Sequence, residues 1–316
     1  MKKFYTLLFL LATVFAFSAC SESEGFDPYR SQEKRPMYPA VVSFSSVDND
    51  DTGTDKKWEF TYNADNTIKA YKYSNHVITK SGVEIIENHS GKLIYYTDAA
   101  GVKWIQNDLV VSNVVKDVTS EESYCDTIKE DVKIISDLIH SIKTTGQRTY
   151  SNGTYEIYSN TRDFSYTDKY CTGSSYTHSL GTTTYRYDWG NAQLKRVTVY
   201  EQGNNNSMSQ MVYNYQHSKR ELACDYGFNT LSFVYGNFPE VYAAMNLFGE
   251  TSAYEIESEN YSGYRNINGT RYDISPVSRS YSLLESNNSV TYAADSPNFI
   301  SYFFTFAKYP PINHAI

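Results

Sequence analysis

The chain has 316 residues, with 28 Lys and Arg against 36 Asp and Glu, which leaves a formal net charge of −8 at pH 7. This acidic balance argues against nucleic acids and anionic lipid headgroups as partners. Tyrosine is unusually frequent, with 31 copies. Because Tyr combines a large ring with a polar tip, it suits half-buried strands, and the composition is typical of an exported, β-rich protein.

Residues 1–19 have the pattern of a secretory signal peptide. Two lysines precede an uncharged apolar run over residues 4–17, which is short for a membrane-spanning helix but has the length of a signal-peptide core. Ser18 and Ala19 then lead directly into Cys20. This junction resembles the lipobox of bacterial lipoproteins, with Phe in place of the usual Leu at its first position. The resemblance implies cleavage before Cys20 and acylation of Cys20. The alternative is an ordinary signal peptide followed by an incidental Cys.

Residues 20–36 contain Ser, Glu, Pro and Gly without hydrophobic periodicity, and we expect a flexible tether there. The acyl anchor would hold the protein at a membrane, because no later segment is apolar enough to span one. Ser21 stands where lipoproteins of the inner membrane tend to carry Asp, so the resemblance implies an outer-membrane lipoprotein, facing either the periplasm or the cell surface. The acidic stretch "SESEG" resembles the export tags of surface-displayed lipoproteins, or is only a solvated linker.

Alternation of apolar and polar residues begins at Met37, and we predict a single β-rich domain over 37–316, with a subdomain break near 118–148 left open. The alternating segments are separated by short polar clusters, which predict hairpin turns. The predicted turns are 63–66 ("NADN"), 87–91 ("ENHSG"), 98–101 ("DAAG"), Asn152-Gly153, 188–193 ("DWGNAQ"), 202–207 ("QGNNNS"), Asn268-Gly269 and Asn287-Asn288. The last alternating stretch, 299–309, is strongly apolar on one face, so we expect a central strand rather than an edge there.

Several of these hairpins share a loose pattern in which an aromatic residue ends one strand and an aliphatic residue opens the next. Tyr62 precedes Ile68 by six residues and Tyr187 precedes Leu194 by seven. The pattern resembles the Tyr-Asp hairpin repeats of Rhs-type proteins, most clearly in "YDWGNAQL". The chain is similar to uncharacterised bacterial outer-membrane lipoproteins that combine such hairpins with a lipidated N-terminus. The resemblance implies a twisted sheet of hairpins and carries no catalytic residues over.

Two helices are predicted to interrupt the strands. Thr119 lies three residues before Glu122, a capping-box pattern, and the segment of about 120–145 then carries one apolar stripe at spacings of three and four residues. The stripe consists of Tyr124, Ile128, Val132, Ile135, Ile139 and Ile142. A short helix is predicted over about 239–248, because Pro239 suits a first helical turn. The expected fold class is therefore mainly β, an extended twisted antiparallel meander of hairpins with one long amphipathic helix and one short helix.

The loop "DNDDTGTDKKWE" (48–59) partly matches a calcium-binding template. Asp48, Asp50, Thr52 and Glu59 occupy its first, third, fifth and twelfth positions. The alternative is a solvated acidic hairpin loop, because the flanking segments have the pattern of strands rather than helices. No His or Cys spacing matches a metal site, and we expect no cofactor. Besides Cys20, the cysteines permit one disulfide, whose pairing is left open among Cys125, Cys171 and Cys224.

No nucleophile elbow, phosphate loop or dinucleotide-binding turn occurs in the sequence, so we expect a protein without catalytic activity. The aromatic residues are the main functional lead. Trp58, Trp104 and Trp189 each lie beside a predicted turn, where they can stack on a sugar or a lipid. The alternative is cross-strand packing within the sheet.

The sequence thus favours a lipid-anchored, non-catalytic binding or scaffold module at the outer membrane, with the membrane itself and a glycan or a protein as partners. Two alternatives stay open: a periplasmic carrier of an apolar ligand, and a hydrolase that acts on polysaccharide. An enclosed apolar cavity would favour the carrier, and carboxylates that converge in a cleft would favour the hydrolase.

Overall fold

The structure is a computed structural model. It describes residues 39–47, 52–65, 67–117, 120–191, 193–203, 208–221, 240–243, 245, 247–249, 254–267, 270–286, 289–294 and 299–306. All of these residues belong to one compact unit, Lys34–Ile316. The predicted signal peptide, the tether and Cys20 lie outside the described residues. No described helix is both long and apolar enough to cross a membrane.

The described residues form 17 strands and one helical turn. The strands are β1 (Pro39–Val47), β2 (Gly53–Tyr62), β3 (Ile68–Ile78), β4 (Glu84–Thr97), β5 (Lys103–Lys116), β6 (Glu121–Ile135), β7 (Leu138–Tyr150), β8 (Tyr155–Thr167), β9 (Tyr170–His178), β10 (Gly181–Gly190), β11 (Gln193–Gly203), β12 (Met208–Glu221), β13 (Tyr254–Ile267), β14 (Thr270–Ser280), β15 (Ser282–Ser286), β16 (Ser289–Ala294) and β17 (Phe299–Phe306). The helical turn, α3, is Glu240–Ala243, between β12 and β13.

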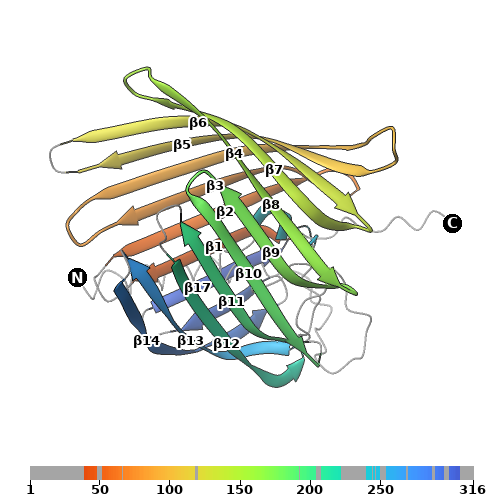
Figure 1. The fold of residues 1–316 in the computed structure, drawn as a ribbon, viewed down its shortest axis with the longest axis vertical. Coiled ribbons are helices and arrows are strands. Elements are labelled where there is room, and N and C mark those ends of the chain that lie inside the picture. The colour runs from red at the N-terminus through yellow and green to blue at the C-terminus, as the bar shows by residue number, and fades with distance from the viewer. Residues whose placement is uncertain are drawn as a thin grey trace. The chain divides into compact units, whose positions relative to one another are not determined.

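All the strands belong to one antiparallel sheet, in which consecutive strands pair from β1 to β14 and from β15 to β17. Only Tyr281 separates β14 from β15, and its N–H donates to the carbonyl of Glu257 on β13 at 2.8 Å, so the two segments continue each other. β1 pairs with β2 on one side and with β17 on the other. The sheet therefore closes on itself around a common interior (Figure 1).

Short turns with suitable residues explain the meander. Ser136 and Asp137 join β6 to β7 with φ of 51° and 62°, the signature of a type I′ turn, whose twist matches that of the flanking strands. Gly101 and Gly153 occupy positive φ in the turns after β4 and β7. The turns at Gly101 and Gly153, and the one that joins β2 to β3, confirm the corresponding sequence predictions. The turn at Ser136-Asp137 was not predicted. The turns predicted at 202–207, Asn268-Gly269 and Asn287-Asn288 lie wholly or partly outside the described residues. β17 pairs on both sides, with β1 and β16, which confirms that the C-terminal stretch is not an edge.

The two faces of the sheet differ sharply. One face carries the buried residues, for example Tyr71, Leu93 and Ile105, and the opposite face carries alternate residues of the same strands. Exposed charged residues occur along that opposite face: Lys57, Lys72, Lys92, Asp108, Lys129 and Lys143. The described part of the outward face thus carries charged side chains together with exposed apolar ones such as Ile94 and Val110.

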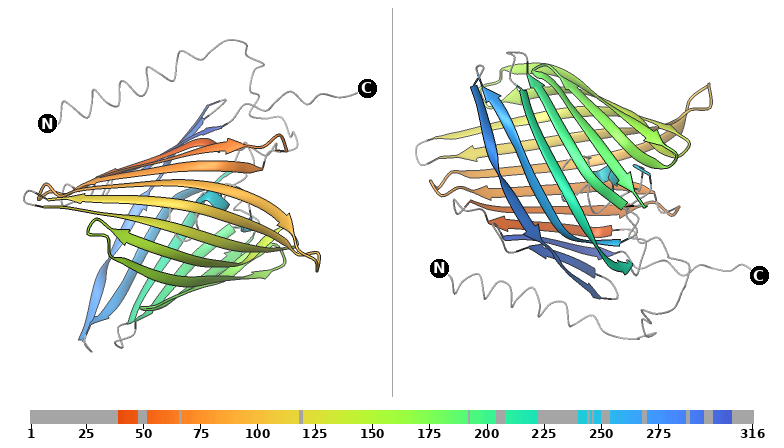
Figure 2. Two further views of the ribbon diagram at one scale, coloured as in Figure 1. Left: turned by 90° about the horizontal axis from the view of Figure 1, so that it is seen from above. Right: turned by 60° about the horizontal axis from the view of Figure 1, so that its bottom comes forward.

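The described residues between β12 and β13, which are 240–243, 245 and 247–249, pack on the buried face, within the closed sheet (Figure 2). Tyr242 is fully buried, and its hydroxyl donates to Oε2 of Glu130 on β6 at 2.6 Å. Phe248 is 3% exposed and packs on Phe164 of β8, with ring centroids 5.0 Å apart. These contacts fill part of the interior with side chains, so the interior is a packed core there rather than an open channel.

The predicted long helix is wrong. Its residues form β6 and β7, which pair with each other from Tyr124↔Tyr150 to Ile135↔Leu138. Tyr124, Ile128 and Val132 are four residues apart, a spacing that places them on one side of a helix and also on one face of a strand. Positions 126 and 130 distinguish the two structures, because a strand with a fully apolar interior would carry apolar residues there. In this sheet the interior is partly polar, and the Asp and Glu at these positions hid the alternation that is typical of a strand.

The predicted short helix is also wrong. Of the described residues in this segment, only Glu240–Ala243 are helical, a single turn, and Leu247 N–H bonds to the carbonyl of Tyr242 at 3.4 Å without continuing the helix. The segment instead follows the sheet: the carbonyl of Leu247 accepts from Ile139 N–H of β7 at 3.0 Å. Contacts with neighbouring strands override the local helical preference of this segment.

The turn predicted at 87–91 is wrong as well, because β4 runs through it without a break. His89 Nε2 and Glu87 Oε1 lie 2.5 Å apart, and the ring of His89 lies 4.5 Å from that of Tyr73. Gly91 is needed for space rather than for a turn: a Cβ there would lie 2.1 Å from Cε1 of Tyr71. A polar, Gly-containing stretch can thus be a strand when its polar groups pair in the interior.

Candidate functional site: a pocket at one end of the closed sheet

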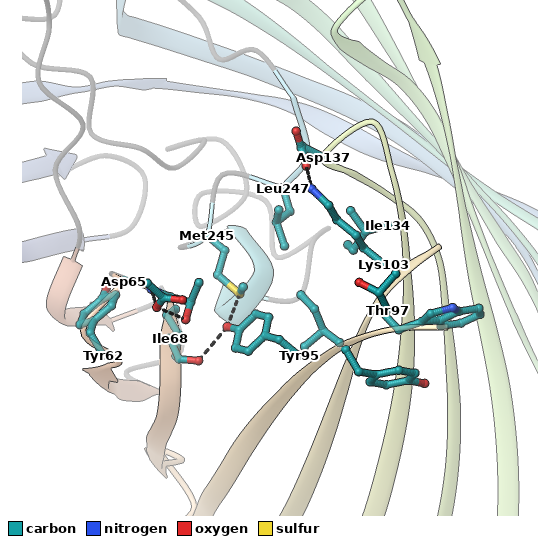
Figure 3. A pocket seen from close by; sticks show the side chains of 14 residues that line it. Tyr62, Asp65, Ile68, Tyr95, Thr97, Lys103, Ile134, Asp137, Met245 and Leu247 are labelled. Carbon is teal, nitrogen blue, oxygen red and sulfur yellow. Dashed lines mark hydrogen bonds and ion pairs between the residues drawn. The ribbon is translucent and has the colours of Figure 1, made fainter. Parts of the chain in front are cut away.

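A pocket of about 450 Å³ opens at the end of the sheet where β2 joins β3, β4 joins β5 and β6 joins β7. The segment after α3 closes it on the inner side. Its lining consists of Tyr62, Asp65, Thr67, Ile68, Tyr95, Tyr96, Thr97, Lys103, Trp104, Ile105, Ile134, Asp137, Met245 and Leu247. Figure 3 shows the side chains of Met245 and Leu247 facing those of the strands.

The floor of the pocket is aliphatic. Ile68, Ile105 and Ile134 are between 1% and 6% exposed and belong to the core. The hydroxyl of Tyr95 donates to the carbonyl of Ile68 at 2.7 Å and lies 3.9 Å from Sδ of Met245 (Figure 3). Burial raises the pKa of Tyr95 far above its usual value, so this phenol stays neutral and keeps its donor proton. The floor therefore suits the apolar part of a ligand.

The β2–β3 turn places a carboxylate on the rim. Thr67 donates to Oδ1 of Asp65 twice, from Oγ1 at 2.6 Å and from its N–H at 3.1 Å, the geometry of an Asx turn. The hydroxyl of Thr67 is the main cause of a lowered pKa at Asp65. Asp65 therefore stays ionised at neutral pH and can accept hydrogen bonds from a ligand.

The β4–β5 turn fixes an aromatic pair next to the mouth of the pocket. Asp98 accepts from the N–H groups of Ala100 and Val102, each at 2.9 Å, and its second oxygen accepts from Nε1 of Trp104 at 2.9 Å. The indole donor is the main cause of a lowered pKa at Asp98. Trp104 also stacks on Tyr96 with ring centroids 6.5 Å apart and planes 10° from parallel. The Trp104 ring is thereby held in one orientation. Because Ile105 belongs to the buried face, the neighbouring Trp104 points to the outward face, as does Tyr96, which lies opposite it on β4.

An ion pair completes the rim. Nζ of Lys103 and Oδ1 of Asp137 lie 2.7 Å apart, and both side chains are well exposed (Figure 3). An exposed pair of this kind contributes little stability. Its effect is to place one donor and one acceptor at the mouth of the pocket.

Of the three tryptophans predicted to bind a ligand, Trp104 is the one that lines this pocket. Trp58 is 5% exposed and packs on Tyr73, with ring centroids 4.9 Å apart. Nε1 of Trp189 donates to the carbonyl of Cys171 at 2.8 Å, and its ring packs on Tyr170. The three belong to β2, β5 and β10 and do not share a binding surface.

The residues of the predicted calcium loop are only partly described. Asp48 and Asp50 lie outside the described residues, and Thr52 directly precedes β2. Glu59 pairs with Lys57, whose hydrogen bond is the main cause of a lowered pKa at Glu59. Glu59 is six residues along the strand from Gly53, roughly 20 Å at the rise of a strand. The described residues contain no cluster of three or more His, Cys, Asp or Glu side chains with the geometry of a metal site.

Cys125 is exposed and Cys171 is buried, and both are free thiols. Burial raises the pKa of Cys171 to about 12. Cys20 and Cys224 lie outside the described residues.

Sequence reasoning missed the polar groups of the interior. Nδ2 of Asn107 donates to Glu130 at 2.8 Å and to the hydroxyl of Tyr71 at 3.0 Å. Further along the sheet, Arg148 forms two hydrogen bonds with Asp126, at 2.9 and 3.0 Å. Asp126 and Glu130 are even-numbered, like the apolar residues of β6 that face the interior. This alternation was the signal available in the sequence. The groups rigidify the core and lie outside the pocket lining.

No family model matches the chain, and no curated protein sequence matches it. A solved structure, the crystal structure of a porin-like protein from Bacteroides uniformis, aligns with 86% of this chain and 98% of its own. The two share 12% sequence identity, with a TM-score of 0.46. A likeness at this level assigns neither a family nor a function to the chain.

Proposed function

We propose that this protein is a lipid-anchored, non-catalytic binding module at the outer membrane, and that the end group of a glycan occupies the pocket at the end of the closed sheet. The observation that carries the proposal is the pocket itself, with an aliphatic floor, a Tyr95 ring held by its hydrogen bond to Ile68, and an ionised Asp65 on its rim. Its volume of about 450 Å³ is within the range of small-molecule sites.

The chemistry of the lining matches that of a sugar. A pyranose ring presents an apolar C–H face and a border of hydroxyl groups. Aromatic rings with a fixed orientation offer a stacking surface for the C–H face. The carboxylates of Asp65 and Asp137, with the ammonium of Lys103, offer hydrogen-bond partners for the hydroxyl groups. The ligand would stand with its ring against Tyr95 and its hydroxyls toward the mouth.

The state of the rim carboxylates supports binding rather than hydrolysis. Glycoside hydrolysis requires a carboxylic acid whose pKa is raised so that it can donate a proton. The pKa of Asp65 is lowered by Thr67, and Asp137 is paired with Lys103. The charged outward face of the sheet suits a domain that stands in water on the tether that follows Cys20.

The experiment is a titration of purified protein with monosaccharides and short oligosaccharides, followed by tryptophan fluorescence and calorimetry. Tyr95→Ala and Asp65→Asn should each weaken binding by roughly tenfold or more, equivalent to about 1.4 kcal/mol. Trp189→Phe is the matched control, because Trp189 lies away from the pocket. Saturable binding that both pocket variants leave unchanged would refute the assignment of the site.

The aliphatic floor also keeps the carrier as a second candidate. A long-chain fatty acid in the same titration distinguishes the two. If it binds and sugars do not, and if Ile134→Asp abolishes its binding, the pocket is that of an apolar carrier.

A further inference from the structure

Strand β8 has a neighbour on both sides along only part of its length. β7 pairs with it from Thr149↔Tyr155 to Ser141↔Asp163, whereas its pairing with β9 begins at Thr161↔Thr177. Among the described strands, residues 155–160 are therefore paired on one side only. Figure 1 shows the β7–β8 hairpin projecting beyond the turn between β9 and β10. This segment, 155–160, is called the β8 edge below.

The β8 edge coincides with the most exposed large apolar side chains of the described residues. Ile157 is 75% exposed, Leu180 70% and Tyr155 65%, and the next, Tyr272, is 55% exposed. Tyr155 and Ile157 share one face of the edge, and Leu180 belongs to the turn between β9 and β10. If the β8–β9 register is extended beyond Thr161, the turn that contains Leu180 comes beside the β8 edge. Exposed apolar groups beside unpaired backbone groups mark a surface that another strand can cover.

A second one-sided strand shows how this fold protects an edge. Among the described strands, β14 pairs with β13 alone, and it contains Pro276 together with Arg271 and Asp273. Proline removes a backbone donor, and charges oppose the approach of another strand. The β8 edge, "YEIYSN", contains no proline and no basic residue, and Glu156 is its single charge. The β8 edge therefore lacks the proline and the paired charges that oppose strand pairing at β14.

We propose that the β8 edge pairs antiparallel with the same edge of a second copy of this chain, so that two sheets join across a twofold axis. A twofold axis perpendicular to the sheet keeps the outward face of one copy on the same side as the outward face of the other. Residues whose side chains lie on the same face, such as two odd-numbered residues, therefore stand opposite each other. With Ile157 opposite Ile157 of the partner subunit, Tyr155 stands opposite Ser159 of the partner subunit, and Glu156 stands opposite Tyr158 of the partner subunit. The register places no like charges together and covers the exposed Tyr155 and Ile157 of both copies.

In this register the edge pairs with an identical edge and no like charges meet, which favours a second copy over an unrelated peptide as the occupant. Six residues per copy make a smaller contact than a stable dimer interface, so the dimer should be weak in dilute solution. Confinement to a membrane raises the effective concentration of two copies and favours the pairing. That last step depends on the proposed lipid anchor, whereas the pairing itself does not.

The test is sedimentation velocity on the purified full chain in mild detergent, over a series that reaches about 1 mM, the range where a weak contact saturates. We expect a monomer–dimer equilibrium that Ile157→Lys and Ile157→Glu each weaken by at least about tenfold, through like charges at the twofold axis. An equimolar mixture of these two variants should regain the dimer, because Lys then faces Glu. A merely structural role for Ile157 would not give this recovery.

Val110→Lys is the matched control. Val110 is 47% exposed on the outward face of β5, which is paired on both sides, so this variant should dimerise as the wild type does. Melting temperatures of all variants should agree, since Ile157 is largely exposed. A chain that stays monomeric throughout the series overturns the proposal. So does a dimer that Ile157→Lys does not weaken, or a mixture of the two charge variants that stays monomeric.

Discussion

Replacing Gly91 by Ala tests whether the buried face of the sheet is packed as described. Gly91 on β4 lies directly opposite Tyr71 on β3, and the tyrosine ring lies over the glycine. An added Cβ would lie 2.1 Å from Cε1 and 2.3 Å from Cζ of that ring. Tyr71 is 6% exposed, and its hydroxyl accepts from Asn107 at 3.0 Å. The ring therefore has to move and weaken this hydrogen bond in order to relieve the clash.

Overpacking of this kind costs about 1–3 kcal/mol. For a domain of this size, each kcal/mol lowers the melting temperature by roughly 2–4 °C. We therefore expect Gly91→Ala to melt about 2–12 °C below the wild type, measured by circular dichroism together with the urea midpoint. Truncating the ring in the double variant Gly91→Ala, Tyr71→Ala should make the two changes non-additive, because the clash then disappears.

Gly53→Ala is the matched control. Gly53 also lies in a strand, has no positive φ, and a Cβ added there would have no heavy atom within 4 Å. Alanine should therefore be neutral at this position, or stabilising by up to about 1 kcal/mol, because it restricts the unfolded chain. Equal melting temperatures for Gly91→Ala and Gly53→Ala would refute the packing of Tyr71 over Gly91.

The interior, the turns and the thiols each allow a further test. Phe248→Ala should cost about 3–5 kcal/mol in urea unfolding, since it empties a buried site within the closed sheet; a loss below about 1 kcal/mol would contradict the packing of that segment. The pKa of Asp98 is lowered from 3.8, chiefly by the Trp104 indole, so its stabilising effect exists above about pH 4 and is lost as the pH falls through the lowered pKa. Asp98→Asn should reduce the acid sensitivity of unfolding, and an unchanged pH profile would contradict this. In the native protein iodoacetamide should modify Cys125 well before Cys171, whose pKa is about 12, as mass spectrometry of the peptides can show; equal rates would refute the burial of Cys171.

The turns at 63–66, 98–101 and Asn152-Gly153 could be predicted from local sequence because they depend on local geometry. Asn152-Gly153 and the segment 98–101 place glycine where φ is positive, and no other residue type adopts that conformation as readily. The stretch 87–91 has a similar composition but lies within β4. Its polar groups find partners on neighbouring strands, which local sequence does not specify.

The binding pocket was only partly accessible to sequence reasoning. Trp104 was a candidate because it follows a turn, yet nothing local separated it from Trp58, which is buried in the core. The pocket lining combines three hairpin turns with residues near 245, more than a hundred residues further along the chain. Sites of this kind depend on which strands the closed sheet brings together.

By itself, the sequence determined the β-rich character of the chain and the location of several hairpin turns, because propensity and turn chemistry are local properties. The tertiary structure decided that 121–150 form strands, since Asp126 and Glu130 face a polar interior whose partners, Arg148 and Tyr242, come from other segments. It also decided the closure of the sheet through β1 and β17, the pocket, and the β8 edge, which is paired on one side only among the described strands. Each of these depends on contacts between residues distant in sequence, whose energies no local pattern records.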